Sequence, residues 1–288
     1  MAKAPGHQFG QMVGLLVEEI VKSVLQEFAD KYGYYLDVKG YRGNAREGTK
    51  VTWTDKYDCD HDLDFVIEKD GSADSRGRPL AFIETAWRRY TKHSKNKVQE
   101  IQGAILPTAE MHRWDAPFLG AVLVGIFTSN AIEQMERSGF HVLYVHRSAI
   151  IGAFKTAGIA IDFDEDTPDK HFRTAVKSLG KLTVAQRKKF KDDLRSRMGK
   201  DFTTFVATLA KALGRQIKKI VVVPLFGIPS EFATISEAKR FLETEMKPAA
   251  TAPMHKIDIF VCYNNGDRID ASFQEPAKAQ AFLDYVAK

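Results

Sequence analysis

The 288-residue sequence predicts an α/β protein with a mixed central sheet flanked by helices, followed by a C-terminal α+β region. Helix-like and strand-like apolar patterns alternate through residues 1–166, as they do in proteins whose helices cover the faces of a sheet. Residues 167–288 instead begin with long helical patterns and end with two short strand–helix patterns. We therefore predict two domains, with the boundary between residues 166 and 167.

In the first domain, apolar residues at a helical period predict a helix over Phe9–Tyr32, and turn residues separate the strand patterns that follow. Further strands are expected at Val51–Trp53, Asp62–Glu68, Leu80–Trp87, Gly120–Phe127 and His141–Val145, and further helices from Ser94 to a stop at Pro107, at Ser129–Glu136 and at Ser148–Ala157. The run Gly120–Phe127 is apolar throughout, which is typical of a strand buried on both faces.

In the second domain, helical patterns cover most of Pro168–Leu213, and a strand is expected at Lys219–Leu225. A weak repeat of spacing 41 follows, in which one set of residues matches a second set at the same internal offsets: Phe232, Ala238, Phe241 and Leu242 against Phe273, Ala279, Phe282 and Leu283. Two tandem strand–helix units would produce this repeat, and so would chance matches between helices rich in Ala and Phe.

The composition excludes several classes of protein. With 44% hydrophobic and 27% charged residues, the chain is expected to bury a sizeable core and not to be disordered. Its two cysteines exclude a disulfide scaffold. Its longest apolar runs reach about ten residues, against the roughly 20 that a membrane helix needs. The N-terminus has no apolar signal core, so we expect a cytoplasmic protein without a membrane partner.

The net charge of +5 hides a strong segregation of charge. Residues 170–220 contain 15 Lys and Arg against three Asp, which gives this segment +12 and leaves −7 for the rest of the chain. A second basic stretch, residues 87–97, holds five cations and no acid. Basic segments in an otherwise acidic protein favour a surface that faces a polyanion, although a solvated helix face would have the same composition.

Two carboxylates lie within or at the end of apolar strand patterns, at Asp64 and Glu84. A buried carboxylate is costly unless it is paired or binds a metal, and a hairpin between the two strands could bring these acids together. Two carboxylates with backbone oxygens form the hard oxygen site that Mg²⁺ prefers. Pairing with Arg88, Arg89 or turn backbone is the alternative for either acid alone.

The order of these features resembles the PD-(D/E)XK nuclease superfamily, and most closely its type II restriction endonucleases. The shared pattern is an aspartate at a strand end, a gap of 20 residues to an apolar strand carrying Glu84, a cationic stretch and a helix. The similarity covers roughly residues 10–165, and its motif is short and degenerate. It implies a restriction-endonuclease-like core that hydrolyses phosphodiester bonds with Mg²⁺, for which Mn²⁺ would substitute.

The resemblance also implies roles for single residues. Asp64 matches the motif aspartate, a metal ligand, with Asp62 as the alternative because a single strand would place both on one face. Glu84 matches the second metal ligand, and Thr85 the residue whose carbonyl completes the coordination. Either Glu18 or the adjacent Glu19, on the first helix, could supply the further acid found in some members.

Ala86 departs from the superfamily pattern, because a lysine that aligns the nucleophile and stabilises developing charge usually stands there. Three explanations are open. The lysine has migrated to the next helix, as Lys92, Lys95 or Lys97; the chain is a deliberately inactivated variant; or it is a non-cutting relative. We favour migration to one of these lysines. Lys97 directly precedes the core-facing Val98, and a cation near a helix start opposes the helix dipole, which indicates another use.

The predicted function is sequence-specific cleavage of double-stranded DNA, with a homodimer matching the symmetry of a palindromic site. Contacts to DNA phosphates are expected from Arg88, Arg89, Lys92, Lys95, Arg187, Lys188 and Lys189. Two alternatives remain. A repair or junction-resolving nuclease would share the fold and metal site, whereas a catalytically inactive DNA-binding module would explain Ala86.

Overall fold

The structure is a computed structural model that describes residues 4–91, 94–161, 163, 167–225, 228–245 and 256–288. The chain divides into two compact units, the first formed by residues 1–111 and 117–208 and the second by residues 112–116 and 209–288. The division after residue 208 differs from the boundary expected at 166/167, because the helices that follow residue 168 pack largely within the first unit.

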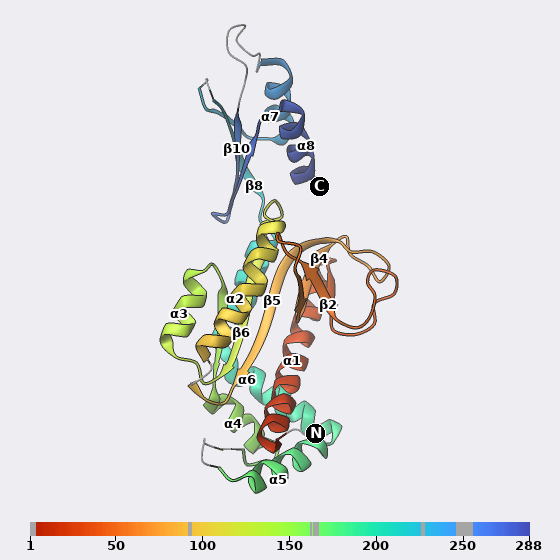
Figure 1. The fold of residues 1–288 in the computed structure, drawn as a ribbon, viewed down its shortest axis with the longest axis vertical. Helices are drawn as coiled ribbons and strands as arrows, with labels where there is room; N and C mark the ends of the chain where they lie inside the picture. The colour runs from red at the N-terminus through yellow and green to blue at the C-terminus, as the bar shows by residue number, and fades with distance from the viewer. Residues whose placement is uncertain (1–3, 92–93, 162, 164–166, 226–227, 246–255) are drawn as a thin grey trace. The chain divides into compact units, whose positions relative to one another are not determined.

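The described residues of the first unit form a five-stranded central sheet, a separate two-stranded ribbon and six helices (Figure 1). The strands of the central sheet are β1 (Tyr35–Val38), β4 (Phe65–Lys69), β5 (Arg78–Arg88), β6 (Phe118–Gly125) and β7 (His141–His146), and those of the ribbon are β2 (Val51–Thr54) and β3 (Asp60–Leu63). The helices are α1 (Pro5–Tyr32), α2 (Ser94–Met111), α3 (Ser129–Arg137), α4 (Arg147–Thr156), α5 (Asp169–Gly180) and the larger part of α6 (Val184–Leu213).

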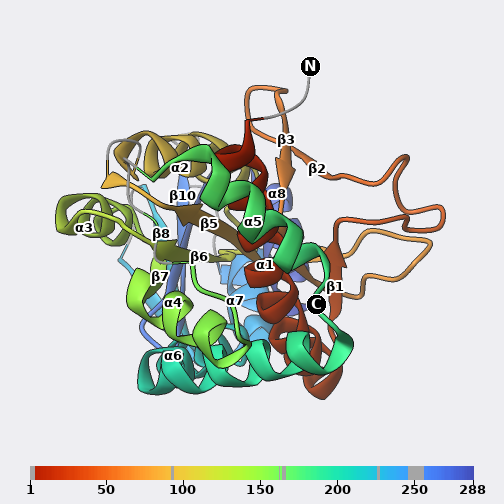
Figure 2. The same cartoon turned by 90° about the horizontal axis from the view of Figure 1, so that it is seen from below.

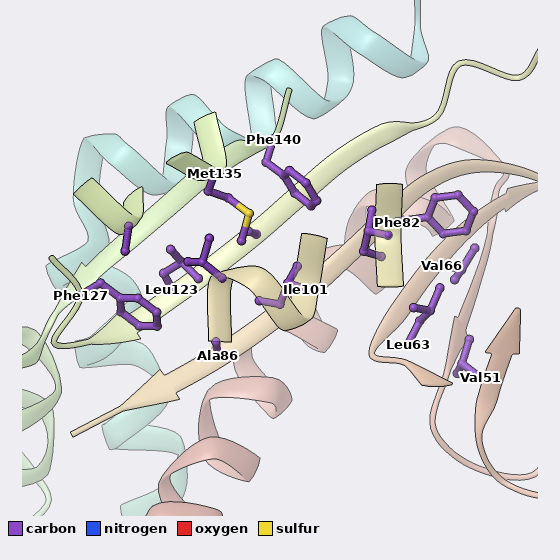
Figure 3. Close-up of a cluster of buried hydrophobic side chains, with 14 of the residues drawn as sticks. Val51, Leu63, Val66, Phe82, Ala86, Ile101, Leu123, Phe127, Met135 and Phe140 are labelled. Atoms are coloured by element: carbon purple, nitrogen blue, oxygen red, sulfur yellow. The ribbon is translucent and has the colours of Figure 1, made fainter. Parts of the chain in front are cut away.

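The central sheet is mixed, as the sequence predicts. Its strand order is β1-β4-β5-β6-β7. The pairs β1/β4 and β4/β5 are antiparallel, and the pairs β5/β6 and β6/β7 are parallel. Helices α2 and α3 cover one face through a cluster that includes Ile101 and Met135 packed against Phe82 and Leu123 (Figure 3). Helices α1, α4 and α6 lie on the opposite face (Figure 2). This core holds β5 rigidly between two helical layers.

The single strand expected at residues 62–68 is wrong, because the chain forms two strands that separate at Asp64. β3 leaves the central sheet and pairs with β2, which places Asp62 opposite Thr52. β4 stays in the central sheet, with Phe65 opposite Ile83 of β5. Asp62 and Asp64 therefore do not share one face of one strand.

The helix stop expected at Pro107 is also wrong, since α2 continues to Met111. The last turn is held by Thr108, a buried residue whose hydroxyl donates to the carbonyl oxygen of Ala104 at 2.7 Å. Helix α1 begins at Pro5, four residues before the expected start, because proline is well suited to the first turn of a helix.

The second unit confirms the two strand–helix copies. Its antiparallel sheet has the order β11-β10-β8-β9, built from β8 (Ile217–Pro224), β9 (Ser230–Phe232), β10 (Ile257–Tyr263) and β11 (Arg268–Phe273). The helical segments are α7 (Ile235–Arg240), a π-helical turn η2 (Phe241–Glu245) and α8 (Pro276–Ala287). In each copy a strand ends at the repeated phenylalanine, and a helix begins three residues later.

No helix within the described part of the chain is both long enough and apolar enough to cross a membrane.

Candidate active site

A cavity of about 820 Å³ lies beside α1, β5 and the first turns of α2. Five acids line it: Glu18, Asp62, Asp64, Glu84 and Glu100. The same cavity is lined by Lys97 and Arg88. Three elements that are separate in the sequence thus bring acids and cations into one concave site.

The hairpin of β4 and β5 sets the position of the two motif acids. Because Phe65 is paired with Ile83, Asp64 and Glu84 are neighbours at the end of the ladder. The backbone N–H of Asp64 donates to Oε1 of Glu84 at 2.8 Å. The backbone N–H and the hydroxyl of Thr85 both donate to Oδ2 of Asp64, each at 2.8 Å. The acids therefore meet as the sequence predicts, and Thr85 fixes the rotamer of Asp64.

Burial and charge repulsion raise the pKa values of two acids of the site, Glu84 and Glu18. Glu84 is 8% exposed, and its burial, together with the nearby charge of Asp64, raises its pKa to about 8. The Asp64 N–H and the charge of Lys97 act in the opposite direction. Burial, and then the charge of Asp64, also raise the pKa of Glu18. A cation placed among these carboxylates would relieve their repulsion.

Asp64 and Glu84 fit a magnesium ion of the type that keeps several waters. Among the described residues, no hydrogen bond is made by Oδ1 of Asp64 or Oε2 of Glu84, so each acid has one carboxylate oxygen available to a ligand. No three His, Cys, Asp or Glu side chains of the described ranges converge into a complete protein cage. Mg²⁺ is commonly bound through one or two carboxylates, with water and substrate phosphate completing its shell.

Asp62 lines the same cavity, but its carboxylate is held by other side chains. It lies on β3, where Nζ of Lys50 contacts its Oδ2 at 2.5 Å and the hydroxyl of Thr52 donates to its Oδ1 at 2.9 Å. The bond from Lys50, followed by that from Thr52, lowers the pKa of Asp62. Both oxygens of Asp62 thus have partners, and its role as an alternative metal ligand stays a prediction.

The three lysines considered as replacements for the motif lysine have different positions. Lys97 lines the cavity, is 17% exposed at its side chain, and has its Nζ 2.6 Å from Oε1 of Glu100. Lys95 is exposed on the first turn of α2 and does not line the cavity. Lys92 lies outside the described residues. Of the described pair, Lys97 is the one that faces the acids.

Ala86 lies on β5 two residues after Glu84 and is 4% exposed. Its methyl group belongs to the apolar cluster that contains Ile101 and Leu123, as Figure 3 shows. The residue also lines the cavity. A longer side chain at position 86 would thus start from the core and extend toward the carboxylates.

The end of β5 supplies the two arginines of the site. Arg88 donates from Nη1 to the carbonyl oxygen of Trp87 at 3.0 Å, while its buried Nε has no acceptor among the described residues. Burial lowers the pKa of Arg88. The guanidinium carbon of Arg89 lies 4.2 Å from the ring centres of both Tyr90 and Phe172. Both arginines line the cavity, so their expected position near the reacting phosphate is geometrically possible.

The basic residues of α6 are placed differently from what the charge count suggests. Arg187 and Lys191 approach the carboxylate of Glu19 at 3.8 and 2.7 Å. Lys188 and Lys189 are exposed. Part of the basic segment therefore neutralises Glu19 of α1, which, unlike Glu18, does not line this cavity.

Sequence reasoning missed several residues of the site. Lys39 lines the cavity, yet it belongs to no motif. Gly6, Gly10 and Gly14 also line it, and these glycines precede Glu18 at a constant spacing of four. That spacing is a readable signal, because residues four apart lie on one face of a helix.

Comparisons with known proteins add no family assignment. No protein-family model matches this chain, and no curated protein matches it. One solved structure, titled as that of a protein of unknown function, AF1548, aligns with 72% of this chain and 98% of its own at 11% identity. Its TM-score of 0.28 is too low for the likeness to support any argument about fold or function.

Proposed function

We propose that this protein is a Mg²⁺-dependent endonuclease that hydrolyses phosphodiester bonds of double-stranded DNA, with a restriction-endonuclease-like core and the sequence specificity of a type II restriction enzyme. The observation that carries the proposal is the meeting of Asp64 and Glu84 in one cavity with Arg88 and Lys97. Acids that hold a cation and bases that hold phosphate are the two requirements of metal-dependent phosphodiester hydrolysis.

The carboxylates of Asp64 and Glu84 would hold the metal. Glu18 lies close enough to Asp64 for their charges to interact. Bound Mg²⁺ would supply an activated water and stabilise the charge that develops on the phosphate. Thr85 orients Asp64 through two hydrogen bonds, so its side chain has a role besides the carbonyl ligation that the superfamily implies.

Lys97 takes the place of the motif lysine in this proposal. Its charge already acts on Glu84, and its present partner is the exposed carboxylate of Glu100, one turn along α2. Because the Glu100 carboxylate is 65% exposed to solvent, this ion pair contributes little free energy, and a phosphate can compete for the ammonium group. Arg88 offers a further guanidinium, and its buried Nε–H donates no hydrogen bond to any described residue.

The proposed reaction requires cleavage that depends on a divalent cation. Purified protein is incubated with unmethylated DNA of phage-genome length, in Mg²⁺, in Mn²⁺ and in EDTA, and the ends of any fragments are sequenced. We expect discrete fragments with either metal and intact DNA in EDTA. A parallel digestion of closed circular DNA separates cleavage within a strand from digestion that starts at a strand end.

A catalytically inactive DNA-binding module is the second candidate, and the burial of Ala86 in the apolar cluster favours it. In that case DNA would be retarded by the protein in an electrophoretic assay, yet neither metal would produce cleavage of any sequence. The homodimer expected for a palindromic site belongs to the endonuclease proposal, and sedimentation of the protein with and without DNA would test it.

A further inference from the structure

The face of α1 that lines the cavity is formed by glycines. Gly6, Gly10, Gly14 and then Glu18 follow one another at intervals of four residues, and all of them line the cavity. Glycine weakens the interior of a helix relative to alanine. Three glycines on one face of a helix that is otherwise well packed therefore need an explanation.

Packing within the chain does not require glycine at positions 10 and 14 of α1. A Cβ atom at position 14 would meet no atom within 4 Å, and one at position 10 would meet only the Trp87 ring, at 3.9 Å. Alanine would thus fit at both positions in the structure as it stands. The space in front of these glycines is open, which indicates room kept for an occupant that approaches the helix backbone closely.

A second cavity, of about 440 Å³, continues the first along α1. The two cavities share Glu18, Lys39, Asp62 and Asp64 in their walls. The second is also lined by Lys22, by Lys50, which pairs with Asp62, and by Glu19, which pairs with Lys191 of α6. Together they form a channel that runs along α1 past the carboxylates.

Positive charge lies at both ends of this channel. Toward the start of α1, the guanidinium of Arg89 lies beside Gly6, where a Cβ would be 3.4 Å from Nη2. The twelve residues from Gly6 to Glu18 correspond to about 18 Å of helix, and the four from Glu18 to Lys22 to about 6 Å. The first turn of α1 has no acidic residue, so its positive dipole end adds to the charge near Arg89.

We propose that this channel binds one strand of a nucleic acid by its sugar–phosphate backbone, with the glycine face of α1 as its wall. Arg88 and Arg89 contact phosphates on one side of the carboxylates, and Lys22 and Lys39 contact phosphates on the other. At a rise of 3.4 Å per nucleotide, the channel covers about seven nucleotides of a duplex strand. The inference rests on the proposed function for the phosphate that reacts at Asp64 and Glu84, but strand binding is measurable without hydrolysis.

The test is a matched pair of variants, Gly14→Leu in the channel and Gly103→Leu in α2. Gly103 is exposed, also has open space at its Cβ position, and does not line either cavity. Both changes replace a helical glycine, so both are expected to raise the melting temperature. Only Gly14→Leu should lower the affinity for DNA, by about tenfold or more.

Affinity is measured by fluorescence anisotropy with a labelled duplex of about 20 base pairs and with its single strand, in Ca²⁺ so that binding is read without hydrolysis. In the same assay, Arg88→Met and Lys39→Met should each reduce the slope of log affinity against log salt by about one. If Gly14→Leu fails to fold, Gly14→Ala takes its place, with Gly103→Ala as its control.

The outcomes separate this inference from the proposed function. Affinity that Gly14→Leu leaves at the wild-type value, or wild-type protein that binds neither probe, overturns the channel. Loss of binding in Gly14→Leu together with a wild type that never cleaves DNA supports the channel and contradicts the nuclease. Cleavage by the wild type that Gly14→Leu retains in full supports the nuclease and contradicts the channel.

Discussion

Glu84 is the residue in which burial and charge repulsion are most concentrated. Its carboxylate is almost fully buried, has Asp64 as its neighbour, and among the described residues accepts a hydrogen bond only from the Asp64 backbone. Its raised pKa means that, without a metal, the folded protein favours the protonated carboxyl near neutral pH. Metal binding must displace that proton, so affinity for Mg²⁺ should rise with pH.

The raised pKa of Glu84 also makes the free energy of unfolding depend on pH. The folded-state pKa of Glu84, about 8, lies above the ordinary value of 4.5 that it has in the unfolded chain, so the stabilisation is complete below about pH 4.5 and is lost as the pH rises to about 8. In EDTA, the melting temperature of the wild type should therefore fall between pH 5 and 8 relative to that of Glu84→Gln. Parallel melting curves for the two proteins across that range would contradict the raised pKa.

Lys97 carries the prediction about the missing motif lysine. Lys97→Met should lower the rate of DNA hydrolysis on the order of 100-fold, because a positive group near the transferring phosphate is lost. Ala86→Lys in the same background should restore part of the rate, since position 86 also lines the cavity. Single-turnover cleavage measures both effects. Full activity in Lys97→Met would show that another cation serves the phosphate.

At the scale of elements, the separation of β3 from β4 decides which acids form the site. The strands with Asp64 and Glu84 could be predicted because each acid interrupts a short apolar run. The break at Asp64 could not, since residues 62–68 read as one continuous strand pattern. The break depends on the pairing of β3 with β2, a contact that no local pattern encodes.

The loops that follow β1 and β4 are joined by a buried ion network. The guanidinium of Arg42 contacts both oxygens of Glu68, at 2.7 and 2.8 Å, and Asp37 at 2.8 Å. It also donates to the carbonyl oxygens of Ser72 and Ser75. This network connects segments about 30 residues apart without a hydrophobic core of their own.

Removal of that guanidinium should be strongly destabilising. Arg42→Met leaves Glu68 buried without its cation, and we expect a loss of about 3–5 kcal/mol in the free energy of unfolding. Lys50→Met, in the exposed pair with Asp62, is the control and should cost less than about 1 kcal/mol. Urea titration measures both. A loss in Arg42→Met as small as that of the control would mean that the network does not stabilise the loops.

At the scale of the whole molecule, the segregation of charge could be read from the sequence, but its use could not. The basic segment 170–220 suggested a single surface facing a polyanion, yet Lys191 pairs with Glu19 and Arg195 with Glu27. Arg195 and Glu27 are 168 residues apart, so no count along the chain could pair them. Lys188 and Lys189 remain exposed and available to phosphate.

The two units also differ in how far the sequence predicted them. In the second unit, the repeated phenylalanines Phe232 and Phe273 mark strand ends, so a pattern of spacing predicted the structure correctly. In the first unit, the mixed sheet was predicted from the alternation of elements. The channel along α1 was not, because it depends on residues from three elements that meet only after folding.

The central claim is that Asp64 and Glu84 form the site of metal-dependent DNA cleavage. Its most direct test is the cleavage rate in Mg²⁺ of Asp64→Asn and Glu84→Gln, against the wild type and Asp60→Asn. Asp60 is an exposed acid of β3 that lines neither cavity, so its variant controls for a general loss of charge. We predict a rate lower by about 1000-fold or more in the first two variants and an unchanged rate in Asp60→Asn. Full activity in both Asp64→Asn and Glu84→Gln would contradict the claim.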